Sequence, residues 1–188
     1  KTEQSQLKDV RAEKSAIFSQ LKTKQSELAA MVREFEAEER AIEAELAAYN
    51  RRPSNHPKVS YKGRLMRPIS GRTTSSFGMR FHPILHRTRM HKGIDIDGYT
   101  GQPIVAAGDG VVISARYSRG YGNKIMLDHG NGLSTVYAHC SRFYVSSGQT
   151  VKRGQRIGAV GSTGLSTGSH LHFEVYVNGK AVNPSSRL

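Results

Sequence analysis

Glycine is absent from the first third of the chain, and this absence divides the sequence into two kinds of structure. None of the 19 glycines precedes Gly63, and the first proline is Pro53. Residues 2 to about 50 are instead rich in Ala, Glu, Lys, Gln and Leu, which favour a helix. From about Ile69, short β-branched runs alternate with glycine-containing turns. The sequence therefore predicts a long helix followed by a β domain.

The predicted helix carries the apolar spacing of a coiled coil. Lys14, Lys24, Glu38 and Glu45 interrupt the seam. A lone helix about 70 Å long is not stable with so much polar surface, so we expect pairing with a second copy, a partner protein or an upstream segment. A passive spacer is the alternative. The apolar side chains follow alternating steps of three and four residues at Leu7, Val10, Ile17, Leu21, Leu28, Met31, Phe35, Ile42 and Tyr49.

A basic, proline-containing connector, RRPSNHPKVSYKGRLMRP, covers residues 51–68. His56 in this connector is interpreted as a solvated loop residue. We therefore predict a helical coiled-coil segment at 1–50, a basic linker at 51–68 and a β domain at 69–188.

The β domain is predicted to be compact and antiparallel, so that the fold class is mainly β. PIVAAGDGVVISARY indicates two strands around a Gly-Asp-Gly turn. KIMLDHGNGLSTVYAH and HFEVYVNGKAV each indicate two strands around an Asn-Gly turn, the pair of residues that favours a tight hairpin.

Charge and cysteine content narrow the kinds of site that this domain can hold. The net charge is +13, and only 5 of the 15 acidic residues follow residue 50, against 20 of the 28 Lys and Arg. Such a field favours polyanions: nucleic acid, an anionic membrane or an anionic cell-wall polymer. The single cysteine, Cys140, excludes an intrachain disulfide and a zinc site of paired thiolates. A metal site here would use His and carboxylate ligands.

The chain contains no run of 18 apolar residues, and KTEQSQLKDV lacks the apolar core of a secretory signal. Because it starts at Lys1 rather than Met, we expect a soluble segment whose targeting sequence is absent.

Two pairs of side chains have spacing that suits a metal. In MHKGIDID, His91 and Asp95 are predicted to lie on one face of a strand. In GSHLHFEV, His170 and His172 are predicted to lie on one face of another strand, and Glu174 lies on the same face. Unpaired polar groups on a covered face are costly, so metal binding or catalysis explains them better than packing. Zinc suits neutral imidazole and carboxylate ligands and, with three of them, leaves a position for water.

The motifs HKGID, YAH and HLHFE together resemble the lysostaphin-type zinc metallopeptidases of the M23 family, which include LytM-like autolysins and murein endopeptidases. SSFGMRFHPI, GYGN, DHGNG, VKRGQRIGAVGSTG and VNGKAVNP extend the resemblance from about Pro68 to Pro184. Departures at Ser76, Cys140 and Ser169 concern loop shape rather than candidate ligands. The resemblance implies a zinc-dependent endopeptidase that cleaves peptidoglycan peptides in the cell envelope, either the periplasm or the cell-wall exterior.

The resemblance also assigns roles to five residues. It implies one zinc ion bound by His91, Asp95 and His172, with His139 and His170 as catalytic histidines. One of these two would accept the proton of the attacking water, and the other would stabilise the oxyanion.

Several other residues of the β domain are expected to lie near the site or to be structural, and two of them have two interpretations. Glu174 and Asp97 would hold a ligand imidazole, although Asp97 equally suits a loop residue. Tyr121 would line a substrate groove or cover a sheet edge. We expect His82 and His86 to border the cleft without acting in catalysis, and His129 to be structural.

Three functional alternatives stay open. The β domain would be a catalytically silent wall-binding regulator of other murein hydrolases, or an enzyme blocked by its own helix or connector. Nucleic-acid binding would satisfy the basic charge but leave the His and Asp set unexplained, because the few aromatic residues form no stacking platform.

Overall fold

The structure, a computed structural model, describes residues 2–51, 60–82, 84 and 86–188. Residues 52–59 of the predicted connector, His56 among them, therefore lie outside the described residues. Contacts divide the chain into two compact units, Lys1–Ala37 and Glu38–Leu188. The predicted division at residues 50 and 68 stays a prediction.

The predicted helix is present as α1, Glu3–Asn50. Its part in the first unit exposes large apolar side chains: Leu7 is 52% exposed, Phe18 71% and Leu21 61%. Among the described residues, no helix is both long and apolar enough to cross a membrane.

The last part of α1, residues 38–50, belongs to the second unit. Ile42 and Leu46 are buried there. Three helix carboxylates form ion pairs with basic side chains of the strands: Glu39 with Arg89 at 2.7 Å, Glu43 with Lys92 at 2.7 Å, and Glu45 with Arg116 at 2.6 Å. Burial and charge pairing thus make this stretch an integral part of the second unit.

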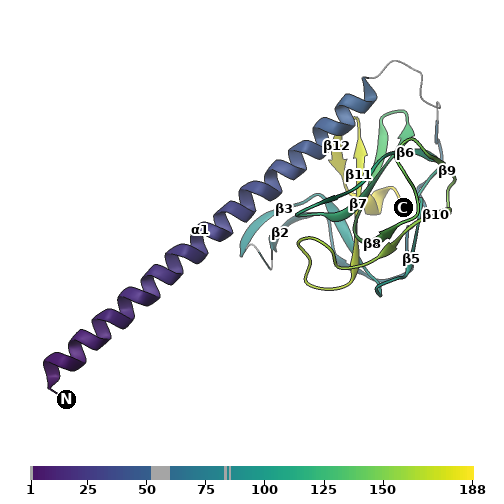
Figure 1. Ribbon diagram of the computed structural model, residues 1–188. Coiled ribbons are helices and arrows are strands. Elements are labelled where there is room, and N and C mark those ends of the chain that lie inside the picture. The colour runs from purple at the N-terminus through teal and green to yellow at the C-terminus, as the bar shows by residue number, and fades with distance from the viewer. Residues whose placement is uncertain (1, 52–59, 83, 85) are drawn as a thin grey trace. The chain divides into compact units, whose positions relative to one another are not determined.

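The second unit is mainly antiparallel β, as predicted (Figure 1). Its ten-stranded sheet has the central order β1-β4-β11-β8-β7-β6-β9. β10 pairs with β5 and β8, β12 pairs with β11, and β2 and β3 form a separate hairpin. The strands are β1 Thr73–Ser75, β2 Gly78–His82, β3 Arg87–His91, β4 Gly93–Asp97, β5 Pro103–Val105, β6 Gly110–Ser118, β7 Gly122–Gly130, β8 Leu133–Phe143, β9 Thr150–Val151, β10 Arg156–Val160, β11 His170–Val177 and β12 Lys180–Val182, followed by the 3-10 helix η1 Pro184–Ser186.

The Asn-Gly turns form the two hairpins predicted from them. Asn131 and Gly132 join β7 to β8 with φ of 52° and 74°, and Asn178 and Gly179 join β11 to β12 with φ of 51° and 76°. Positive φ at both central residues is the requirement of the tight turn that matches strand twist. The Gly-Asp-Gly segment also lies between two strands, but these do not pair with each other, because β5 pairs with β10 and β6 with β7 and β9.

One hydrophobic core supports the site. Ile94 and Ile96 of β4 and Leu171 and Phe173 of β11 are fully buried in it. Since side chains alternate along a strand, the polar residues between them lie on the opposite face of the sheet.

Candidate metal centre and active site

The pairing of β4 with β11 brings together the two half-sites found in the sequence. The register places His172 opposite Asp95 and His170 opposite Asp97. Directly opposite residues share a face of the sheet, so these four side chains form a two-by-two group. The predicted alternation of apolar and polar residues along both strands therefore places these four polar side chains on one face of the sheet.

His91, at the end of β3, completes a set of three possible ligands. Its Nε2 atom lies 3.2 Å from Oδ1 of Asp95 and 3.1 Å from Nδ1 of His172. Nδ1 of His172 lies 2.8 Å from the same Asp95 oxygen. All three ligand atoms lie within 4.8 Å of one another. In a tetrahedral zinc site, bonds of about 2.1 Å separate the ligand atoms by about 3.4 Å. The observed separations are close to that value.

In His91 and His172, the ring nitrogen that points away from Asp95 already has a hydrogen-bond partner. Nδ1 of His91 lies 2.8 Å from the Ser76 carbonyl oxygen, and Nε2 of His172 lies 3.0 Å from Oε1 of Glu174. Both partners only accept, so both outer nitrogens carry the proton. The two inner nitrogens of neutral rings then present lone pairs toward Asp95, as a metal requires.

Three acceptors so close together need a positive charge between them. Burial lowers the pKa of His172, but hydrogen bonds and charge from Asp95 and Glu174 outweigh burial and raise it to about 10. Burial raises the pKa of Asp95, while its bonds to His172 and His91 hold that pKa far below the ordinary value. The site therefore holds either an added proton or a cation, and the donor set fits a metal ion.

Glu174 anchors this site from behind. Its carboxylate is fully buried and accepts hydrogen bonds from the hydroxyls of Tyr121 at 2.9 Å and Tyr176 at 3.0 Å as well as from His172. Burial raises the pKa of Glu174, but these bonds lower it below the ordinary value. Such a carboxylate fixes the orientation of a ligand imidazole and increases its basicity.

His139 and His170 lie beside the three ligand candidates. Their ring centroids are 4.7 Å apart, and the His139 ring is 6.0 Å from that of His172. Nδ1 of His139 lies 2.8 Å from the Thr163 carbonyl oxygen, and Nδ1 of His170 lies 2.8 Å from that of Gly168. Each ring is thus held by one nitrogen, which leaves Nε2 of the neutral form able to accept a proton.

An irregularity in β8 aims His139 at the site. His139 has a φ of 60°, a left-handed conformation that is uncommon for a residue other than glycine. The register between β7 and β8 shifts at this point, which indicates a bulge. Burial, followed by the charges of His172 and His170, lowers the pKa of His139 to about 3. It is therefore neutral at physiological pH.

The sequence reasoning missed Arg80 of β2. Its Nη2 lies 3.3 Å from Oδ2 of Asp95, the oxygen that does not face the imidazoles. The alternation of Gly78, Arg80 and His82 along the strand was the available signal, but the pairing of Arg80 with Asp95 depends on where the hairpin lies.

The remaining predicted residues lie outside the group of three. His82 and His86 lie at the tip of the β2–β3 hairpin. Burial, followed by Arg80 and Arg89, lowers the pKa of His82 to about 4. His129 is buried, with its ring nitrogens 2.7 Å from the Asp109 carbonyl oxygen and 2.8 Å from the Thr135 hydroxyl.

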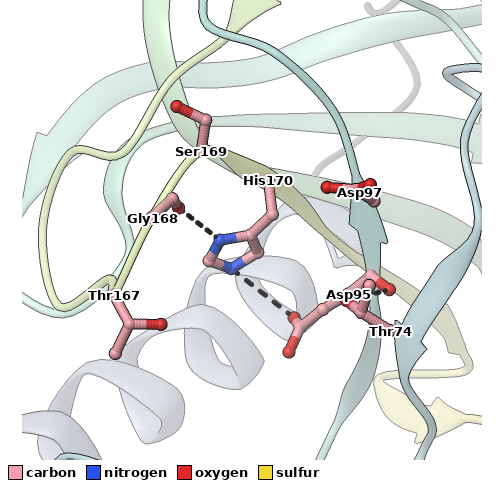
Figure 2. Close-up of a pocket in the computed structure, with 7 residues that line it drawn as sticks. All are labelled: Thr74, Asp95, Asp97, Thr167, Gly168, Ser169 and His170. Carbon is pink, nitrogen blue, oxygen red and sulfur yellow. Dashed lines mark hydrogen bonds and ion pairs between the residues drawn. The ribbon is translucent and has the colours of Figure 1, made fainter.

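A pocket opens beside His170. Figure 2 shows Asp97 and Thr74 on one side of the His170 ring, with the loop before β11 on the other. The lining residues are Thr74, Asp95, Asp97, Thr167, Gly168, Ser169 and His170.

Two buried histidines and a half-buried aspartate, with two further histidines beside them, form the kind of donor set that a metallopeptidase centre needs. The family model for "Peptidase family M23" matches residues 89–184. The chain belongs to this family, which confirms the resemblance and implies a metal.

Several of the similar proteins are named as peptidases. The chain is 50% identical over 115 residues to the DD-carboxypeptidase/endopeptidase Mpg of Neisseria meningitidis, a match that covers 61% of this chain and 26% of Mpg. It is 44% identical over 113 residues to the peptidoglycan DD-endopeptidase ShyA of Vibrio cholerae, covering 60% and 26%. The chain thus spans about a quarter of the length of these relatives. A solved zinc-containing peptidase from Vibrio cholerae matches with a TM-score of 0.62 and 37% identity, over 66% of this chain and 40% of that one.

Proposed function

We propose that this chain is a zinc-dependent endopeptidase that hydrolyses peptide crosslinks or stem peptides of bacterial peptidoglycan. The observation that carries the proposal is the convergence of His91, Asp95 and His172, with the Nε2 atoms of two more histidines available beside them. The names of Mpg and ShyA support an endopeptidase, and that of ShyA supports peptidoglycan as the substrate.

His91, Asp95 and His172 would hold the zinc ion. When bound, zinc supplies a Lewis acid that lowers the pKa of a water molecule from 15.7 to about 7 and polarises the carbonyl. Of the proposed catalytic pair, one neutral histidine accepts the proton of the attacking water at Nε2. The other, protonated on both ring nitrogens, donates its Nε2–H to the developing oxyanion. The carbonyls of Thr163 and Gly168 hold the two rings in place for these roles.

The place of action that fits this substrate is the cell envelope. The exposed apolar residues of α1 in the first unit support a coiled-coil partner, either a second copy or another envelope protein. The basic charge after residue 50 suits an anionic cell-wall mesh.

Digestion of purified crosslinked peptidoglycan by the zinc-loaded protein tests the proposal. Mass spectrometry of the released fragments identifies the bond that is cut, and a parallel digestion contains a chelator. We expect cleavage that the chelator abolishes and added zinc restores. A protein that binds zinc and peptidoglycan but releases no fragment would instead be a regulator.

A further inference from the structure

Asp97 stands out among the acidic residues of the second unit. Of the five that follow residue 50, the other four accept hydrogen bonds within the metal site (Asp95), behind it (Glu174) or from backbone amides (Asp109 and Asp128). Asp97 is exposed at the end of β4, and within the described part of the chain its carboxylate has no hydrogen bond or ion pair. Local structure therefore does not account for it.

The position of Asp97 relates it directly to the reaction. It lies opposite His170 in the β4–β11 ladder and two residues beyond Asp95 on the same face. Same-face neighbours along a strand are about 6.5–7 Å apart, and one residue of an extended peptide spans about 3.3–3.6 Å. A peptide with its scissile carbonyl at the metal site would therefore place a residue one or two positions from the scissile bond within reach of Asp97.

The rest of the pocket wall offers acceptors for hydrogen bonds. Thr74, Thr167 and Ser169 contribute hydroxyls on the two sides of His170 (Figure 2). An ammonium group has three donors and no acceptor, so one carboxylate with several hydroxyls complements it. A carboxylate substrate would be repelled at this point, although the domain as a whole attracts anions.

Asp97 is not needed to orient His170. Nδ1 of that ring is already held by the Gly168 carbonyl oxygen, and its Nε2 lies 3.8 Å from Oδ1 of Asp95. A carboxylate beside the ring but bonded to neither nitrogen is free to bind a substrate group instead.

We propose that Asp97 and the hydroxyl-lined pocket beside His170 bind a free ammonium group of the peptide substrate, on a residue within two positions of the scissile bond. The proposal rests on the proposed function. It narrows the substrate to peptides with an unmodified amine near the cut, whether a side-chain amine of a diamino acid or a terminal amine.

The test compares crosslinked stem peptides that differ only in acetylation. One has both a side-chain amine and an N-terminal amine, and two others are acetylated at one or the other. The full zinc-loaded chain, Asp97→Asn and the control Asp109→Asn, which removes a charge outside the pocket, are assayed for kcat, KM and zinc content.

We expect Asp97→Asn to raise KM for the doubly free peptide about fivefold to tenfold, the effect of one charge-assisted hydrogen bond at a partly exposed site. Acetylation of the amine that Asp97 binds should raise KM of the unsubstituted chain equally, and Asp97→Asn should then add nothing. The acetylated peptide that keeps its sensitivity to the substitution identifies which amine is bound. Asp109→Asn should behave as the unsubstituted chain.

If Asp97→Asn raises KM equally for every peptide, or for none of them, the proposed ammonium site is refuted. The proposed endopeptidase function would still stand. If the unsubstituted chain cuts none of the peptides, the proposed function fails, and calorimetric binding of the same peptides decides the ammonium site. Weaker binding by Asp97→Asn of the free-amine peptide alone would still support it, and any other pattern would refute it.

Discussion

His172 lies between two carboxylates, with Nδ1 2.8 Å from Asp95 and Nε2 3.0 Å from Glu174. One carboxylate thus faces the metal position, and the other holds the ring from the buried side. We therefore expect metal affinity to depend on Glu174, although this residue is not one of the three proposed ligands.

Glu174→Gln should weaken zinc binding by about 10-fold to 100-fold, the usual effect of losing a carboxylate behind a ligand histidine. The amide can still accept from His172, so the fold should persist. Competition with a chelating dye measures the affinity. Glu13→Gln, on the exposed part of α1, is the control. Unchanged zinc affinity in Glu174→Gln would remove Glu174 from the metal site.

The two histidines of the HLH motif should separate metal binding from turnover. His172→Ala should lose both zinc and activity, because it removes a proposed ligand. His170→Ala should retain zinc and lose at least about 100-fold in kcat, since general acid–base groups contribute that much or more. Metal analysis and peptidoglycan digestion measure the two properties. Full turnover by His170→Ala would refute its catalytic role.

Zinc binding should tighten with pH, up to about tenfold per unit, because each zinc ion displaces a proton from His172. This dependence of zinc affinity extends over pH values below the raised pKa of about 10. Since the pKa is raised in the folded state, the stability of the metal-free protein that comes from His172 is complete below pH 6.5 and is lost as pH rises through about 10. Chelator competition and urea unfolding across this range measure both effects, and a pH-independent zinc affinity would contradict the displacement.

Leu46→Ala should destabilise the second unit by about 2–5 kcal/mol, because it leaves a cavity where a side chain is 1% exposed. Leu21→Ala is the matched control, since Leu21 is 61% exposed. It should change unfolding of the monomer by less than about 0.5 kcal/mol. Urea unfolding followed by circular dichroism compares the two. If both substitutions lowered the free energy of unfolding by the same small amount, residues 38–50 would not contribute to the core.

The strands and the ligand candidates could be read from the sequence because alternation is a local property. Ile94 and Ile96 mark the buried face of β4 and leave Asp95 on the opposite face. The expectation that His91 shares this strand was wrong, because His91 lies at the end of β3, before the chain turns into β4. The register that places Asp95 opposite His172 is not local, since it depends on how distant strands pair. The resemblance to the M23 family supplied that relationship.

Three features escaped prediction for the same physical reason. The left-handed backbone of His139 results from a bulge, which no residue type in VYAHC announces. The contact of Arg80 with Asp95 depends on the placement of a separate hairpin. The pairing of β5 with β10 joins segments about fifty residues apart, whereas a turn motif indicates only adjacent strands.

Tyr121 supports both chemical halves of the centre from one position. Its carbonyl oxygen accepts the backbone N–H of His139 at 2.9 Å, while its hydroxyl donates to Glu174 behind His172. A shift of the Tyr121 backbone would therefore disturb proton transfer and metal affinity at once. Tyr121→Phe would separate the two contacts, since it keeps the carbonyl that holds His139 and removes only the hydroxyl that holds Glu174. Substitution at this ring could therefore tune metal affinity without moving His139.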